Sequence, residues 1–131
     1  MKKAFYVLIV MVVMLGMLPS AAEAKKVTGM YVSDITGRVD PSITGYRYYL
    51  NVYIEDVDGN PVSGAKVQAK AQISNATLSA YTDESGKAEF FIYTEATYLH
   101  FLVDNVSKRG YIYLSELNLM SDIYLQAPPS P

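Results

Sequence analysis

Hydrophobic and polar residues alternate with a period of two along much of the chain, and the clearest run spans residues 46–55. Because successive side chains of a strand point to opposite faces, this run predicts a strand with one buried face. The residues predicted to face inward are Tyr46, Tyr48, Leu50, Val52 and Ile54. Those predicted to face outward are Arg47, Tyr49, Asn51, Tyr53 and Glu55.

The alanine-rich segment that follows shows the same alternation. Its predicted inward residues are Ala65, Val67, Ala69, Ala71 and Ile73. Alanine also favours helices, but a helix would spread residues of this spacing around its circumference. We therefore predict a second strand over residues 65–73.

Other short strands are predicted between segments rich in Gly, Pro, Asp and Ser, which favour turns. These strands are residues 27–34, 77–82, 88–93, 98–104, 111–114 and 122–126. Seven or eight short strands at this spacing indicate an antiparallel β-sandwich, here a single domain over residues 25–126. Residues 127–131 contain three prolines, which lack the N–H of a strand ladder, so they are predicted to form an exposed tail.

The first 24 residues have the pattern of a helical signal peptide. Lys2 and Lys3 precede an apolar run of 15 residues, and Ala22-Glu23-Ala24 provides a small-x-small cleavage site. A helix that spans a membrane needs about 20 apolar residues, which disfavours the alternative of a retained anchor. We expect cleavage after Ala24 and export to the periplasm, cell envelope or exterior, with no stable membrane insertion afterwards.

The charge and cysteine content of the remaining 107 residues limit the classes of partner and the means of stabilisation that are expected. They carry 9 basic and 12 acidic side chains, so the formal charge is −3 and the basic residues are not clustered in sequence. This balance argues against nucleic acid as a partner. The chain has no cysteine, so core packing alone must stabilise the exported domain.

Two turn motifs lie about twenty residues apart. Residues 56–67 read DVDGNPVSGAKV, and residues 82–90 read TDESGKAEF. Gly59 suits a turn with positive φ, Pro61 fixes φ, and Gly64 permits a bend before Ala65 begins the next inward set. Each motif is therefore predicted to connect two strands.

At these residues the chain resembles bacterial immunoglobulin-like domains of the invasin and intimin type. It is also similar to carboxypeptidase regulatory-like, transthyretin-like sandwich domains, and the resemblance covers roughly residues 46–113. It implies an all-β, immunoglobulin-like antiparallel β-sandwich of seven or eight strands. Such domains serve as spacers in adhesins, accessory modules of secreted enzymes and surface-layer components, and these roles have no fixed residue signature.

The residues offer little for catalysis. With no cysteine and a single histidine, His100, the chain lacks a Cys–His pair and a multi-histidine zinc site. His100 alternates with Leu99 and Phe101, which predicts a position on the outer surface of a strand. We expect no catalytic residues and no cofactor.

A calcium site is the alternative explanation for the first turn. Asp56, Asp58 and Asn60 offer oxygen atoms at alternating positions, as at the start of an EF-hand loop. The glycine is misplaced for such a loop, Pro61 interrupts it, and no glutamate occupies the twelfth position. A hairpin turn is therefore the preferred interpretation.

Tyrosine is unusually frequent, with 12 in the chain and no tryptophan. The outward residues Arg47, Tyr49 and Tyr53 would form an aromatic and cationic stripe, extended by Tyr124 if the last strand lies nearby. Such a stripe could bind a partner or could simply stabilise the sheet through cross-strand pairs. Asn75 and Asn105 each begin a sequon for N-glycosylation.

These observations favour a secreted or cell-envelope interaction and adhesion module without catalytic activity. Its partner would be a protein or a glycan at the cell envelope. The alternative is a carbohydrate-binding or small-ligand-binding accessory module of a secreted enzyme system.

Overall fold

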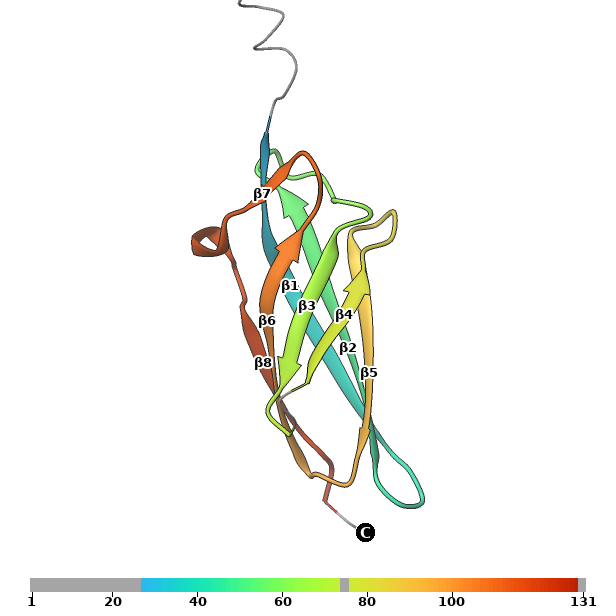
Figure 1. Cartoon of the computed structure of the whole chain (residues 1–131). Coiled ribbons are helices and arrows are strands. Elements are labelled where there is room, and N and C mark those ends of the chain that lie inside the picture. Colours follow the sequence, from blue (N-terminus) through green and yellow to red (C-terminus); the bar gives the residue numbers. More distant parts are fainter. Residues whose placement is uncertain (1–26, 74–75, 130–131) are drawn as a thin grey trace, which may run out of the picture.

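The computed structural model describes residues 27–73 and 76–129, which form eight strands and a short 3-10 helix (Figure 1). The strands are β1 (Thr28–Pro41), β2 (Tyr46–Asp56), β3 (Lys66–Ala71), β4 (Thr77–Tyr81), β5 (Lys87–Thr94), β6 (Tyr98–Ser107), β7 (Tyr111–Tyr113) and β8 (Asp122–Gln126). The helix η1 covers Ser115–Leu117. The predicted signal peptide and Asn75 lie outside the described residues. Within those residues, no helix has the length and apolar character needed to cross a membrane.

The strands form two packed sheets, which confirms the predicted all-β sandwich. Sheet 1 has the order β5-β2-β1-β7, and sheet 2 has the order β4-β3-β6-β8. Figure 1 shows sheet 2 in front of sheet 1. The first, second and fifth strands share one sheet while the third and sixth share the other, as in immunoglobulin-like sandwiches.

The core lies between the two sheets and is built from the predicted inward residues. Tyr48, Leu50, Val52 and Ile54 of β2 are fully buried, as are Val67 and Ala69 of β3. The Tyr48 hydroxyl donates a hydrogen bond of 2.6 Å to the Ala96 carbonyl, which satisfies its polar end. Burial raises the pKa of Tyr48, because the anion would lose its hydration.

The first strand is longer than predicted, running to Pro41 instead of ending at residue 34. A β-bulge between Val32 and Asp34 shifts its register against β2. The bulge places both Val32 and Ile35 in the core, a spacing of three that breaks the period-two pattern. The polar segment beyond it continues as a strand because it pairs along the full length of β2.

Three other predictions are wrong in detail. Ile73 does not face the core but is 41% exposed in a turn, because β3 ends at Ala71. The sandwich is not wholly antiparallel, since β7 pairs in parallel with the start of β1. Ala127 belongs to the packed domain rather than to a free tail: it is 7% exposed, and its N–H donates to the Thr97 carbonyl at 2.7 Å.

The two turn motifs meet at one end of the sandwich. The buried Thr82 hydroxyl donates to the Val62 carbonyl at 2.6 Å and accepts from the Ala65 N–H at 2.8 Å. The Gly86 carbonyl accepts a hydrogen bond of 2.8 Å from the Ile54 N–H. The motifs are thus two halves of one hydrogen-bonded junction that joins the sheets, and we call it the turn junction.

Asp83 organises the second half of the turn junction. One of its carboxylate oxygens accepts bonds from the Ser85 hydroxyl at 2.7 Å, the Ser85 N–H at 2.9 Å and the Lys87 N–H at 3.1 Å. The bond from the Ser85 hydroxyl, followed by that from the Lys87 N–H, lowers the pKa of Asp83. The ionised carboxylate therefore stabilises the folded turn.

We expect Asp83→Asn to lower the melting temperature by a few degrees at pH 7. Since the folded pKa is depressed, this stabilisation is present above the unfolded pKa and is lost as the pH falls through the folded pKa. Thermal melts from pH 7 to about pH 2 should show the two proteins converging. Glu84→Gln, a charge change at the next residue, is the control. The prediction would be contradicted if Asp83→Asn lowered the melting temperature by the same amount at low pH as at pH 7.

Candidate binding face

The outer face of sheet 1 carries a row of side chains that crosses three strands. Arg38 of β1 lies opposite Tyr49 of β2, and Tyr49 lies opposite Phe91 of β5. The Tyr49 and Phe91 ring centroids are 5.2 Å apart at an angle of 52°, and the Arg38 guanidinium carbon lies 4.2 Å from the Tyr49 centroid. Aromatic and cation–π contacts therefore hold the row together.

A second row lies next to it on the same strands. Asp40, Arg47 and Tyr93 occupy neighbouring positions across β1, β2 and β5. Asp40 forms an ion pair of 3.2 Å with Arg38 and raises the pKa of its guanidinium, which links the two rows. The Tyr93 hydroxyl is hydrogen-bonded to the Thr44 hydroxyl.

We call Arg38, Arg47, Tyr49, Phe91 and Tyr93 the aromatic face. Phe91 is 54% exposed and Tyr93 is 46% exposed. Large apolar rings on a flat sheet can be covered by a partner with little loss of side-chain entropy, and arginines beside them provide directed hydrogen bonds. The arrangement therefore has the chemistry of a protein-binding surface, and β5 brings it to the edge of sheet 1.

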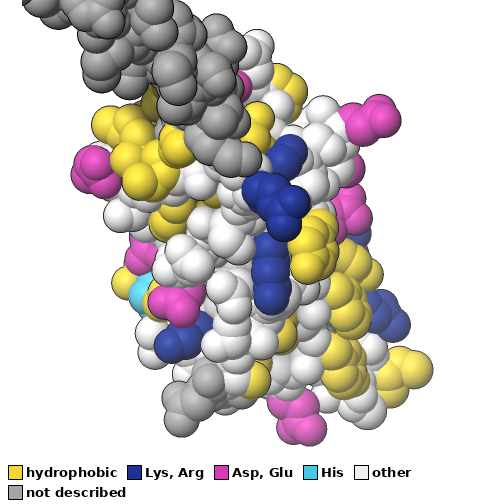
Figure 2. Space-filling view, turned by 45° about the horizontal axis from the view of Figure 1, so that its top comes forward, with side chains coloured by type: hydrophobic (Ala, Val, Ile, Leu, Met, Phe, Trp, Pro, Cys, Tyr) yellow, Lys and Arg dark blue, Asp and Glu magenta, His cyan; other side chains and the backbone are white. Residues whose placement is uncertain are grey.

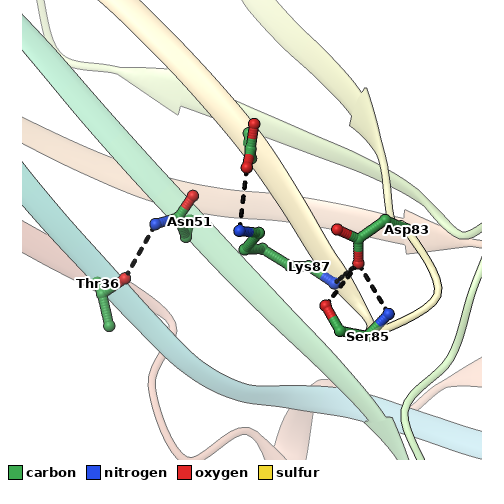
Figure 3. A network of polar contacts seen from close by, with 6 residues as sticks. Thr36, Asn51, Asp83, Ser85 and Lys87 are labelled. Carbon is green, nitrogen blue, oxygen red and sulfur yellow. Dashed lines mark hydrogen bonds and ion pairs between the residues drawn. The ribbon is translucent and has the colours of Figure 1, made fainter.

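The predicted stripe is only partly brought together. Arg47 and Tyr49 lie in adjacent rows, but Tyr53 is separated from Tyr49 by the row that contains Asn51. Asn51 donates to the Thr36 hydroxyl at 3.4 Å (Figure 3). Glu89 is the β5 member of this row, and it forms an ion pair of 3.0 Å with Lys87, which lies opposite Tyr53. A polar band therefore divides Tyr53 from the aromatic face.

Tyr124 does not extend the stripe, because β8 belongs to sheet 2. Its ring stacks on His100 with centroids 4.0 Å apart and planes 2° apart, and it also stacks on Tyr98 at 5.8 Å. The His100 Nε2 atom lies 2.7 Å from an Asp122 carboxylate oxygen. These four residues form a separate cluster on the outside of sheet 2.

The contacts of His100 are those of a residue on the surface of a strand, as the alternation predicts. Asp122 and Tyr124 come from the neighbouring strand β8. Among the described residues, no serine or threonine hydroxyl is hydrogen-bonded to the imidazole. The three groups therefore position one another across the sheet.

The carboxylate of Asp56 is engaged by the turn that contains it. One oxygen accepts hydrogen bonds from the Asp58 N–H at 2.9 Å and the Asn60 N–H at 3.0 Å. Asp56 itself is 8% exposed. In residues 27–73 and 76–129, no three His, Cys, Asp or Glu side chains come together in a group that could hold a metal ion.

The chain matches no protein-family model, curated protein or solved structure. Neither a family nor a relative therefore assigns a function to the aromatic face.

Sequence reasoning missed three residues of the aromatic face. Phe91 and Tyr93 alternate with Ala88, Phe90 and Ile92, so the same pattern that places the latter inward points the former outward. Arg38 carried no such signal, because the bulge in β1 interrupts the alternation before it.

Proposed function

We propose that this protein is a secreted or cell-envelope interaction module that binds a partner protein through the aromatic face of an immunoglobulin-like sandwich. The observation that carries the proposal is the Arg38–Tyr49–Phe91 row, three side chains in contact on an exposed sheet. Export is supported by the signal-peptide pattern of residues 1–24. We assign the module no catalytic role.

The energetics of the row favour binding over a purely structural role. Cross-strand aromatic pairs stabilise a sheet by only about 0.2–1 kcal/mol. This small contribution does not explain why the ring of Phe91 is more than half exposed. Burying the rings against a partner would add about 25 cal/mol for each Å² of apolar surface covered. Tyr and Arg are also among the residues that dominate binding energy at interfaces.

The test compares two surfaces of the same sandwich. We expect Arg38→Ala/Tyr49→Ala/Phe91→Ala to weaken partner binding by about tenfold or more, because residues at the centre of an interface often contribute above 1 kcal/mol each. The partner would be captured from the native envelope on the immobilised mature domain, identified, purified and titrated by biolayer interferometry. Circular dichroism checks that the variant stays folded.

The matched control is Tyr98→Ala/Tyr124→Ala, which removes exposed rings from sheet 2. It should leave the affinity unchanged. Equal binding by the aromatic-face variant and the unmodified domain would refute the proposal. If a glycan array showed saturable binding that only the aromatic-face variant lost, the carbohydrate-binding alternative would replace it.

A further inference from the structure

An open hollow of about 840 Å³ lies at the end of sheet 2, away from the aromatic face. It is lined by residues of β3, the ends of β4 and β6, the turn after β6, and β7, which belongs to sheet 1. Figure 2 shows Lys and Arg side chains in a row down the middle of the view, with acidic side chains to either side of it. The lining itself contains basic residues and no acidic ones, although the formal charge of the chain is −2.

Three cationic side chains line the hollow, and no aspartate or glutamate does. They are Lys66 of β3 and Lys108 and Arg109 of the turn. Within the described part of the chain, none of the three forms an ion pair. Like charges gathered without a counter-charge repel one another, so an anion bound among them would be favoured.

The local structure holds the Lys108 amine and sets the backbone positions of Lys66 and Arg109. The Lys108 amine donates to the Ser63 carbonyl and lies 5.1 Å from the centroid of the Tyr111 ring. Gly110, with a φ of 86°, allows the tight turn that projects Arg109. Lys66 lies between Tyr81 and Ser107 in the register of sheet 2.

Aromatic and amide groups accompany the charges. Tyr81 is 65% exposed at one side of the hollow, Tyr111 and Tyr113 are half-buried, and Asn105 adds an amide. A tyrosine ring can stack against the C–H face of a sugar ring. Hydroxyl and amide groups can bond to its hydroxyls, while cations bind its acidic substituents.

We infer that this hollow is a second binding site, which takes an anionic saccharide such as a chain of uronic acids. It is separate from the aromatic face, because the only strand of sheet 1 among the described residues that lines the hollow is β7, whereas the aromatic face lies on β1, β2 and β5. The cations would bind carboxylates, and the exposed Tyr81 ring would face a sugar ring.

Isothermal titration calorimetry of the mature domain with oligogalacturonate of defined length tests the inference. Binding is expected at about 20 mM salt and should weaken as added salt screens the charges. Lys66→Gln/Arg109→Gln should lower the affinity about 2- to 30-fold, because each exposed ion pair contributes about 0.2–1 kcal/mol. Tyr81→Ala should weaken binding at all salt concentrations.

Lys70→Gln is the matched control, since Lys70 lies on the same strand and outer face as Lys66 but outside the hollow. It should leave the affinity unchanged, as should the aromatic-face variant. The inference is overturned if no binding is detected or if Lys70→Gln weakens binding as much as the double variant does. Equal affinity for a neutral oligosaccharide, or for a polyglutamate peptide of equal charge, would also overturn it.

Discussion

Gly86→Ala is expected to lower the free energy of unfolding by at least about 3 kcal/mol, since two penalties coincide at this position. Gly86 has a φ of 80°, where an L-residue with a Cβ atom is strained by about 1–2 kcal/mol. An added Cβ would also lie 2.7 Å from the Ile54 carbonyl oxygen and 3.1 Å from the Pro61 Cβ atom. The neighbouring backbone must then move. Urea unfolding followed by circular dichroism measures the loss.

Gly59→Ala separates the two penalties. Gly59 has a similar φ of 86°, but its added Cβ would have no neighbour within 4 Å. It should therefore cost only the conformational term of about 1–2 kcal/mol. If Gly59→Ala destabilised the domain as much as Gly86→Ala, the close approach of the two turns would not be the cause.

The turn junction matters for the aromatic face as well as for stability. The hydrogen bond from the Ile54 N–H to the Gly86 carbonyl lies where β2 and β5 leave their shared ladder. These two strands carry Tyr49 and Phe91, whose rings meet only while the register between them holds. A one-residue slip would turn every side chain of one strand to the opposite face. The junction therefore holds the aromatic face in register without belonging to it.

The sandwich could be predicted from local pattern because its sheets are amphipathic. The alternation of β2 gave the correct face for Tyr48, Leu50 and Val52, since a strand has a fixed period of two. Positive φ at Gly59 is predicted from its turn motif, and the structure also has positive φ at Gly64 and Gly86 in the same two motifs. Both features are set locally: the turn by its own residues, and the direction of each side chain by which face of the strand is buried.

The complete binding surface could not be predicted in this way. Arg38 reaches the aromatic face only because a bulge changes the register of β1, and the alternation of residues in this strand does not reveal that bulge. Tyr124 faces away because β8 pairs with β6, a choice made between distant segments. The hollow around Lys66 and Arg109 likewise brings together residues more than forty positions apart in sequence.

Thr82→Val should lower the free energy of unfolding by about 2–6 kcal/mol, although it preserves the shape of the side chain. The lost hydroxyl would leave the Val62 carbonyl and the Ala65 N–H unpaired, in residues that are 1% and 0% exposed. Each buried polar group without a partner costs about 1–3 kcal/mol.

Thr82→Ser provides the control for the hydroxyl, because it keeps both hydrogen bonds and loses one methyl group at a cost of about 1 kcal/mol. The two variants should therefore rank in the opposite order to their hydrophobicity, with serine the more stable, in thermal and urea unfolding of the mature domain. The ranking depends on the hydroxyl bridging both sides of the turn junction. If valine proved as stable as the native threonine, the junction would be held by apolar packing, and the two motifs would be separate turns that happen to touch.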